Sequence, residues 1–231
     1  MTALIKHFER NTVGTDYAVG DIHGCYNKLE KALAPFFDRT KDRLFSVGDL
    51  VDRGPESERA EEFLEYPWFH AVKGNHDDMA ERWPEGNMER SIYAMNGGAW
   101  NIGRTHDEQR STAAAMAALP LAIEVEADAG LIGLVHAECP FPSWASFREA
   151  LMQFRSLNRL QREGIEGLVM WSRDRINSAF DGPVHDVRAV ICGHTPVQGP
   201  VILGNVHYID TGAVFGRDFT FINLDTLEIF S

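Results

Sequence analysis

Residues 44–54 read Leu-Phe-Ser-Val-Gly-Asp-Leu-Val-Asp-Arg-Gly. The stretch opens with a short, mainly apolar run, which is typical of a buried strand, and this run ends in Asp49. Asp52 and Arg53 follow closely, with Gly54 beside them. In an open α/β sheet, ligands bind at the carboxyl ends of the strands, and glycine lets the backbone turn sharply next to them. The stretch therefore predicts an α/β fold with a functional site at this strand end.

The segments on either side repeat this pattern. Tyr17–Gly20 is an apolar run that ends in Asp21, and Phe69–Gly74 is another that ends at Asn75. Helices are predicted in the connections, because apolar residues recur at helical spacing in the first and proline with acidic residues opens the second. These helices cover Lys28–Phe37 and Pro55–Tyr66. Strands and helices in alternation indicate right-handed crossovers and a parallel sheet.

The second half of the chain is richer in strands. We expect a strand pair at Leu121–Val125 and Leu131–His136, and a further strand at Ala189–Gly193. Four short strands are then expected to form a meander: Val201–Leu203, Val206–Asp210, Phe219–Leu224 and Leu227–Phe230.

Two segments are interpreted as mostly helical insertions that cover the site. One runs from Trp83 to about Leu119, and the other, a cap, runs from about residue 139 to 186. Within the cap, the apolar side chains of one helical face are interpreted as its buried side in preference to a peptide groove. That face carries Phe147, Leu151 and Phe154. Asn96-Gly97-Gly98-Ala99 in the first insertion is either a loop near the site or a simple turn.

Length and composition restrict the classes of protein. The 231 residues suffice for one domain with an inserted cap, and 44% hydrophobic with 24% charged residues is ordinary for a globular protein. No apolar run reaches the roughly 18 residues of a membrane helix, and the N-terminal stretch does not resemble a signal peptide. We therefore expect a cytoplasmic protein without a membrane partner. Three cysteines without a CxxC pair, Cys25, Cys139 and Cys192, predict neither disulfides nor a thiolate zinc site, only buried or half-buried thiols.

The net charge of −12 disfavours nucleic acid as a partner, because binding it needs a basic surface. For an anionic substrate, a local positive field must come from elsewhere, and bound cations are one source.

Five predicted strands end in, or run straight into, residues that can bind a metal. Each has an ordinary explanation when taken alone, since Asn75 after Gly74 suits a turn and a lone His136 is more often a structural histidine. Five such residues at five strand ends are hard to generate by chance. The motifs are Asp21-x-His23-Gly24, Gly48-Asp49-x-x-Asp52-Arg53-Gly54, Gly74-Asn75-His76-Asp77, His136 and Gly193-His194.

The first three motifs resemble the three-part signature of the calcineurin-like metallophosphoesterases, in particular the serine/threonine phosphoprotein phosphatases. Later motifs resemble the small bacterial and phage protein phosphatases: His136, Met170-Trp171-Ser172-Arg173, Gly193-His194-Thr195-Pro196 and Asp210-Thr211-Gly212-Ala213-Val214-Phe215. The resemblance spans Asp16 to about Asp225. It implies a four-layer αββα sandwich of two mixed β-sheets, with residues 1–231 as a single catalytic domain.

The resemblance also implies a centre of two divalent metal ions. Its ligands would be Asp21 and His23 for the first ion, Asp49 as a bridge, and Asn75, His136 and His194 for the second. Carboxylate, amide and imidazole groups suit hard and borderline divalent cations. We expect manganese first, and the same ligands accept iron, zinc, nickel or cobalt. Two cations that share a water lower its pKa, which makes hydroxide available for in-line attack near neutral pH.

Four further residues take catalytic roles by the same resemblance. His76 would protonate the leaving group, and Asp52 would orient it. Arg53 and Arg173 would each give forked hydrogen bonds to phosphate oxygens. Two alternatives stay open: Asp52 and Arg53 form only a surface ion pair, or Arg175 takes the place of Arg173. No residue is assigned to an organic cofactor.

The expected activity is hydrolysis of phosphoserine and phosphothreonine in a phosphorylated protein or peptide, which releases inorganic phosphate. The main alternative is a symmetrical dinucleoside tetraphosphate hydrolase of the same fold. In our interpretation such enzymes usually depart from the first two motifs, where this chain keeps His23 and Asp52. A cyclic phosphodiesterase or nuclease fits the two arginines and the acidic surface less well. An inactive phosphate-binding scaffold typically lacks a ligand or the acid, and here all are present.

Overall fold

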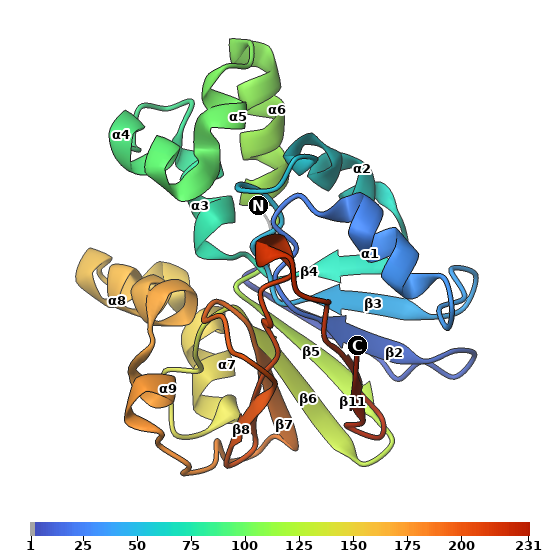
Figure 1. The fold of residues 1–231 in the computed structure, drawn as a ribbon. Coiled ribbons are helices and arrows are strands. Elements are labelled where there is room, and N and C mark those ends of the chain that lie inside the picture. The colour runs from blue at the N-terminus through green and yellow to red at the C-terminus, as the bar shows by residue number, and fades with distance from the viewer. Residues whose placement is uncertain (1–2) are drawn as a thin grey trace.

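The computed structural model describes residues 3–231, which form two β-sheets packed face to face (Figure 1). The larger sheet has six strands in the order β1-β5-β6-β7-β9-β8. These strands are β1 (Ile5–Phe8), β5 (Ala122–Ala127), β6 (Gly130–Val135), β7 (Ala189–Cys192), β9 (Val206–Tyr208) and β8 (Val201–Leu203). Some neighbouring strands in it are parallel and others are antiparallel, so the sheet is mixed.

The smaller sheet has five strands in the order β11-β10-β2-β3-β4. They are β11 (Ile229–Phe230), β10 (Phe221–Asn223), β2 (Asp16–Val19), β3 (Arg43–Ser46) and β4 (Phe69–Ala71). The first three strands predicted from the sequence, β2, β3 and β4, run parallel to one another. β10 is antiparallel to β2, and β11 is antiparallel to β10, so this sheet is mixed as well.

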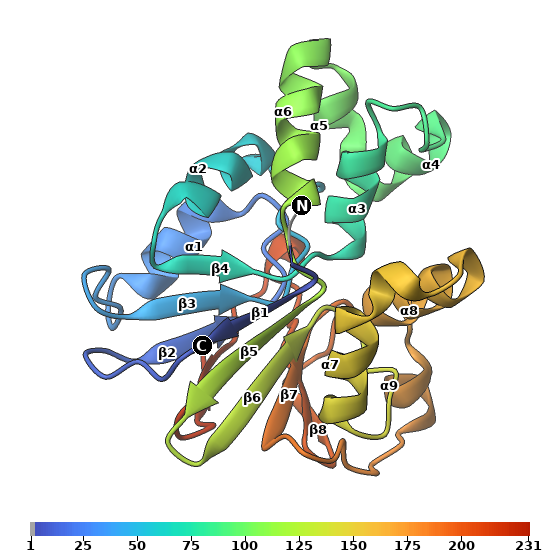
Figure 2. The same cartoon turned by 180° about the vertical axis from the view of Figure 1, so that it is seen from behind.

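Helices cover the outer faces of both sheets (Figures 1 and 2). Those beside the smaller sheet are α1 (Tyr26–Leu33), the 3₁₀ turn η1 (Ser57–Arg59) and α2 (Ala60–Glu65). Between β4 and β5 come α3 (Asn75–Arg82), α4 (Arg90–Tyr93), the π-helical turn η2 (Ala94–Gly98), α5 (Ala99–Ile102) and α6 (His106–Ala117). After β6 come α7 (Trp144–Met152), the 3₁₀ turn η3 (Phe154–Ser156), α8 (Arg159–Trp171) and α9 (Asp174–Ser178), and after β9 the 3₁₀ turn η4 (Ala213–Phe215).

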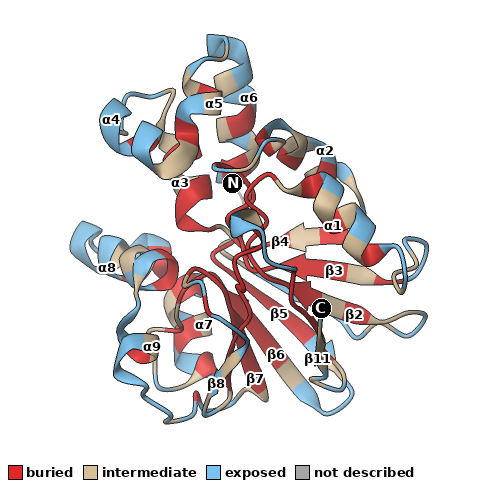
Figure 3. Ribbon diagram, in the orientation of Figure 1, coloured by how far each residue is buried: buried red, intermediate tan, exposed pale blue. Residues whose placement is uncertain are grey.

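Three separate hydrophobic cores show that the layers are helix, sheet, sheet and helix (Figure 3). Side chains of a strand alternate between its two faces, and β6 illustrates the consequence. Its residues Ile132 and Leu134 belong to the core between the sheets, whereas Val135 belongs to the core under α7. Gly133 faces α7, where a Cβ would overlap the ring of Trp144. The αββα sandwich implied by the resemblance is confirmed.

The predicted meander at residues 201–230 is wrong in one respect. Its four strands form two hairpins that belong to different sheets: β8 and β9 extend the larger sheet, whereas β10 and β11 extend the smaller one. The chain crosses between the sheets in residues 209–220, where Ile209 belongs to the core between the sheets and Phe219 to the core under α1. Turn signals define a hairpin but do not say which sheet edge receives it.

Both predicted insertions are helical. In the segment 139–186, Phe147, Leu151 and Phe154 are buried against the larger sheet, which confirms their interpretation as a buried helix face. α7 thereby supplies part of the outer helical layer. A role of this segment as a cap stays a prediction. In the part of the chain that is described, no helix is both long and apolar enough to cross a bilayer.

Candidate metal centre

The loops that follow β2, β3, β4, β6 and β7 meet at one edge of the two sheets, where the carboxyl ends of parallel strands lie together. Every residue that the sequence analysis proposed as a ligand is buried there. Their exposed fractions are Asp21 2%, His23 2%, Asp49 1%, Asn75 3%, His136 0% and His194 6%. Such burial of charged and imidazole groups is costly unless they are paired or bind a metal.

Asp49 lies in the middle of this cluster. Its Oδ2 lies 3.4 Å from Nε2 of His23, and its Oδ1 lies 3.4 Å from Nε2 of His136. Two groups of potential ligand atoms share this carboxylate, and the atoms within each group all lie within 4.8 Å of one another. The groups are His23, Asp49 and His76, and Asp49, His136 and His194. The arrangement places Asp49 where one carboxylate can serve two ions.

Backbone carbonyls orient two of the histidines. Nδ1 of His23 lies 3.0 Å from the carbonyl oxygen of Val51, and Nδ1 of His136 lies 2.7 Å from that of Val47. Because a carbonyl can only accept, Nδ1 carries a proton in both rings, and Nε2, which faces Asp49, holds the lone pair when the ring is neutral. This is the tautomer that binds a metal through Nε2.

His194 is turned the other way. Its Nε2 lies 3.2 Å from the carbonyl oxygen of Trp171, so its Nδ1 faces the cluster, 2.9 Å from Oδ1 of Asn75. The same Asn75 oxygen lies 3.0 Å from Nε2 of His136. One amide oxygen from the start of α3 and two imidazole nitrogens from separate loops thus converge.

Asp21 contacts the cluster through the backbone. The N–H of His194 donates to both of its carboxylate oxygens, at 3.2 Å and 3.1 Å, and Gly193 is required because a Cβ there would overlap Asp21 Oδ1. The carboxylate of Asp21 is in neither of the two tight groups, whereas His76, which was predicted to be the acid, is in one of them. The structure therefore brings Asp21 beside the cluster without placing it next to His23.

The cluster has the electrostatic character of a cation site. Burial raises the pKa of Asp21 well above its usual range, and the nearby carboxylates of Asp210 and Asp49 raise it further. Although burial opposes protonation of His136, the carboxylates of Asp49 and Asp21 raise its pKa to about 10. The carboxylates thus favour positive charge beside Asp49, whereas burial lowers the pKa of His23 and of His194 to about 3. With oxygen and nitrogen donors and no thiolate among them, the residues fit hard or borderline divalent cations.

The loops that carry these residues adopt backbone conformations that side chains disfavour. Of the eight residues other than glycine with positive φ in the described chain, five lie at the cluster. They are His23 (φ 45), Asp49 (φ 50), Asp52 (φ 70), Arg53 (φ 69) and His194 (φ 65). Each such residue costs on the order of 1–3 kcal/mol and persists only where the surroundings specify it. This concentration of unfavourable conformations marks the cluster as the functional site.

Asp52 and His76 form a buried pair beside the cluster. Nδ1 of His76 lies 2.9 Å from Oδ2 of Asp52, and its Nε2 lies 4.0 Å from Oδ2 of Asp49. Burial raises the pKa of Asp52, and hydrogen bonds from His76 and Trp100 act in the opposite direction. The contact with His76 and the full burial of Asp52 contradict the alternative of a surface ion pair between Asp52 and Arg53.

The two arginines that were predicted to bind phosphate, Arg53 and Arg173, are both exposed. Nη1 of Arg53 lies 2.7 Å from Nε2 of His23, and its guanidinium lies 5.8 Å from the ring centre of Phe215. Burial lowers the pKa of His194 to about 3, and the charges of His136 and Arg173 act in the same direction, which places Arg173 near this histidine. Arg175 is buried, and its Nη1 donates to the carbonyls of Phe180 and Gly182 at 3.2 Å and 2.6 Å. Arg173 is therefore the better candidate for binding a phosphate, because its side chain is exposed whereas that of Arg175 is buried and bonded to backbone carbonyls.

Residues 17–198 match the family model of the calcineurin-like phosphoesterases. The chain belongs to this family. Serine/threonine-protein phosphatase 1 of Salmonella typhimurium is 35% identical over 209 residues, which cover 88% of this chain and 89% of that protein. A symmetrical bis(5'-nucleosyl)-tetraphosphatase of Coxiella burnetii is 27% identical over 285 residues, which cover 97% of this chain and 92% of that protein. Among solved structures, that of a putative diadenosine tetraphosphatase superposes with a TM-score of 0.65 at 22% identity and covers 98% and 96% of the two chains, so the two share a fold.

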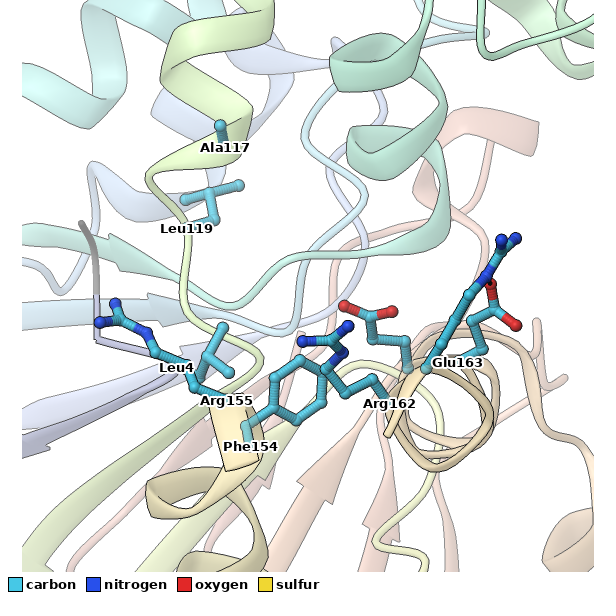
Figure 4. Close-up of a pocket in the computed structure, with 9 residues that line it drawn as sticks. Leu4, Ala117, Leu119, Phe154, Arg155, Arg162 and Glu163 are labelled. Atoms are coloured by element: carbon cyan, nitrogen blue, oxygen red, sulfur yellow. Dashed lines mark hydrogen bonds and ion pairs between the residues drawn. The ribbon is translucent and has the colours of Figure 1, made fainter. Parts of the chain in front are cut away.

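Metal binding is expected here, as in calcineurin-like phosphoesterases in general. A pocket elsewhere in the molecule is separate from the metal-binding cluster. Figure 4 shows this pocket of about 540 Å³, which lies between α8 and the end of α6. Its lining is Leu4, Ala117, Leu119, Phe154, Arg155, Arg159, Arg162, Glu163 and Glu166. None of these residues belongs to the cluster, and Arg159 pairs with Glu163. The pocket therefore lies apart from the cluster of this phosphoesterase.

One residue at the phosphoesterase site was not predicted. Nε1 of Trp100, on α5, donates to Oδ1 of Asp52 over 2.8 Å. It lies in the segment from Trp83 to Leu119, whose sequence has no motif that relates it to the strand ends. The position of Asn96-Gly97-Gly98-Ala99 is now clear as well, since the carbonyl oxygen of Gly97 accepts the N–H of Arg53 at 3.4 Å.

Proposed function

We propose that this chain is a metal-dependent phosphomonoesterase that removes phosphate from phosphoserine and phosphothreonine in proteins. The observation that carries the proposal is the buried Asp52–His76 pair beside the carboxylate of Asp49. A site built only to bind phosphate has no need of a buried imidazole oriented by a carboxylate.

The metal ligands in this proposal are the six buried residues of the cluster: Asp21, His23, Asp49, Asn75, His136 and His194. When bound, two divalent cations supply the Lewis acidity that activates water for attack on phosphorus. The protein holds the imidazoles in the binding tautomer through the carbonyls of Val47, Val51 and Trp171. Manganese is our first choice, and iron, zinc, nickel or cobalt suit the same donors.

His76 is the proposed general acid. A serine or threonine alkoxide is strongly basic and must gain a proton as it leaves phosphorus. With its Nδ1 held by Asp52, the free Nε2 of His76 faces the centre of the cluster and can deliver that proton. Asp52 fixes the ring and stabilises its protonated form.

Arg53 and Arg173 are the proposed phosphate-binding residues. Both guanidinium groups are exposed, one near His23 and the other near His194. Forked hydrogen bonds from an arginine suit the equatorial oxygens of a phosphoryl group, over which charge spreads in the transition state.

A phosphoprotein is favoured as the substrate over a dinucleoside tetraphosphate. The relative named serine/threonine-protein phosphatase 1 is more similar to this chain than the tetraphosphatase, at 35% against 27% identity. The chemistry agrees, because a nucleotide leaving group is far less basic than an alkoxide and gains less from a dedicated acid. The solved structure of the putative diadenosine tetraphosphatase supports the alternative only through its fold.

The experiment that tests the proposal compares two substrates on metal-stripped enzyme, with and without added manganese. The substrates are a phosphoserine peptide and diadenosine tetraphosphate. We expect manganese-dependent release of inorganic phosphate from the peptide and little cleavage of the nucleotide. Preferential cleavage of the nucleotide would move the function to the alternative, and activity on neither substrate with any of the five metals would overturn the enzymatic proposal.

We further infer that residues 1–231 act as one catalytic domain, with the segment at about 139–186 over the site, and that the protein works in the cytoplasm. The contact between Trp171, at the end of α8, and His194 supports the first inference. The second is supported by three cysteines that form no disulfide with one another, as expected in a reducing compartment.

A further inference from the structure

The hydrogen bond between Trp100 and Asp52 connects the segment 83–119 to the proposed acid. Asp52 is completely buried, and a ring nitrogen lies within hydrogen-bond distance of each of its carboxylate oxygens. Nδ1 of His76 faces Oδ2 at 2.9 Å, and Nε1 of Trp100 donates to Oδ1 at 2.8 Å. With no exposed surface, Asp52 has no solvent to replace either donor.

A second residue of the same segment turns toward Asp52. Tyr93, on α4, is buried. Burial raises its pKa, and the negative charge of Asp52 and a hydrogen bond to the Asp52 carboxylate raise it further. Asn101 donates to the hydroxyl oxygen of Tyr93 over 3.1 Å. The indole of Trp100 is thereby one part of a polar contact made by α4 and α5 together.

The π-helical turn between these helices, η2, also contacts Arg53, the residue that follows Asp52. Gly97 has a φ of 98° and lies so close that a Cβ would be 2.5 Å from the backbone nitrogen of Arg53. Asp52 and Arg53 themselves have φ values of 70° and 69°, a conformation that neither residue adopts readily on its own. Contacts from η2 and α5 therefore specify the backbone on which both residues are placed.

We propose that Trp100 is a positioning residue for catalysis: its indole N–H fixes the carboxylate of Asp52 so that His76 is held for proton delivery. This inference rests on the proposed function, in which His76 is the acid. It also gives the segment from Trp83 to Leu119 a catalytic task that is separate from covering the site.

The physical consequence concerns one atom. If the indole N–H is removed, Oδ1 of Asp52 loses the donor that lies 2.8 Å from it, at a carboxylate with no exposed surface. The carboxylate then rotates toward other donors or takes up a proton, and in either case its hold on the ring of His76 weakens. Substrate binding through the arginines does not depend on this hydrogen bond, so kcat falls while KM stays the same.

The test is the substitution Trp100→Phe, assayed on a phosphoserine peptide and on p-nitrophenyl phosphate. Loss of a hydrogen bond to a charged group predicts a fall in kcat of about 10- to 100-fold on the peptide, with KM unchanged. The fall on p-nitrophenyl phosphate should be much smaller, because its leaving group needs little protonation. Loss of packing alone would lower both activities equally.

Trp83→Phe is the matched control. Trp83 packs against the ring of Tyr93, but its Nε1 is buried without a hydrogen-bond partner in the described chain. Its substitution removes an indole N–H from the same region and leaves His76 and Trp100 in place beside Asp52, so both activities should be retained. Should Trp100→Phe fail to fold, benzothienylalanine at position 100 keeps the shape of the indole and removes only the N–H.

A double substitution separates this inference from the proposed function. Once Trp100→Phe has released Asp52, adding Asp52→Asn should lower the peptide activity by less than it does in the native chain. Equal effects in both backgrounds, or full peptide activity of the benzothienylalanine protein, would overturn the role of Trp100. If His76→Asn lowers the activity on both substrates equally, the proposal that His76 is the acid is overturned, whatever the effect of Trp100→Phe.

Discussion

The hydroxyl of Ser172 donates to Oε2 of Glu138 over 2.7 Å. The same oxygen accepts the N–H of Arg175 at 3.3 Å. Glu138 follows His136 by two residues, and Ser172 immediately precedes Arg173. The loop that carries a proposed metal ligand thus also fixes the turn that carries a proposed phosphate-binding arginine. One carboxylate therefore connects the loop after His136 to the turn that contains Arg173.

Arg173→Ala should weaken phosphate binding and stabilisation of the transition state. Loss of hydrogen bonds between a guanidinium and a phosphoryl group predicts a fall in kcat/KM of about 10- to 100-fold and weaker inhibition by inorganic phosphate. Steady-state kinetics with added phosphate measures both. Arg159→Ala, on the exposed face of α8, is the control and should change neither. Unchanged kinetics of Arg173→Ala would exclude this role.

His76→Asn should separate leaving groups by their basicity. General acid catalysis typically contributes about 10²- to 10⁴-fold, so kcat on a phosphoserine peptide should fall by that order. The loss on p-nitrophenyl phosphate should be smaller. Metal content, measured by elemental analysis, should stay at the native level, because the acid is not a ligand in this proposal. A protein that loses metal with this substitution would show that His76 belongs to the metal group in which it lies.

Asp49→Asn should affect both groups of ligand atoms together, since they share this carboxylate. Even residues that only orient metal ligands change metal affinity by about 10- to 100-fold, so loss of a shared ligand should exceed this and abolish turnover. Isothermal titration of the stripped protein with manganese measures the affinity. Retention of metal-dependent hydrolysis would contradict the central place of Asp49, and its loss would also exclude an inactive scaffold.

The stability of the protein should decrease in mild acid because of His70. This ring lies between Phe8 and Phe45, with ring centres 4.4 Å and 5.2 Å away, and burial lowers its pKa from 6.5 to about 4. Between these two values the unfolded chain binds the proton and the folded chain does not, so lowering the pH favours unfolding. At pH 5 the penalty is about 2 kcal/mol relative to pH 8.

Urea unfolding of His70→Phe at pH 5 and pH 8 measures this contribution. The substitution keeps an aromatic ring between Phe8 and Phe45 and removes the titration, so the acid-side loss of stability should shrink by about 2 kcal/mol. His106→Gln, at an exposed position of α6, should leave the pH dependence as it is. An unaltered pH dependence of His70→Phe would refute the assignment.

Two glycine substitutions should change the free energy of unfolding in opposite directions. A Cβ at Gly133 would overlap the ring of Trp144, so Gly133→Ala should destabilise the protein by about 1–3 kcal/mol. Gly164, inside α8, has nothing within 4 Å of an added Cβ, and Gly164→Ala should stabilise it by about 0.5–1 kcal/mol. Chemical denaturation of both variants measures these changes in the free energy of unfolding. A gain in stability from Gly133→Ala would contradict the close packing of α7 on the larger sheet.

The sequence was sufficient for the part of the site carried by β2, β3 and β4. Each of these strands is a short apolar run that passes directly into Asp21, Asp49 or Asn75, and parallel strands bring such ends together. The placement of His136 and His194 beside them depended on the resemblance, because a single histidine after a strand has no distinctive pattern. The resemblance also implied that Asp49 is shared between two ions, and its carboxylate indeed belongs to both groups of potential ligand atoms.

What the sequence did not reveal depends on contacts between distant segments. Trp100 reaches Asp52 through a π-helical turn whose local residues carry no signal for it. β1 was missed because Lys6 and His7 are exposed, so the strand lacks the apolar run by which the others were found. The assignment of β10 to the smaller sheet follows from its pairing with β2, which no turn residue specifies.

That last pairing bears on how the protein is made. β2 lies between β3 and β10, and Val19 faces Phe221 across strands from opposite ends of the chain. A ribosome that has released only the first two hundred residues has already exposed Asp21 and His23, but the sheet edge beside them stays open. Contacts between such distant residues form slowly, and open strand edges invite association with other chains. The edge of β2 is therefore covered only after residues 221–223 have been synthesised, and a chain that lacks them leaves this edge open to association with other chains.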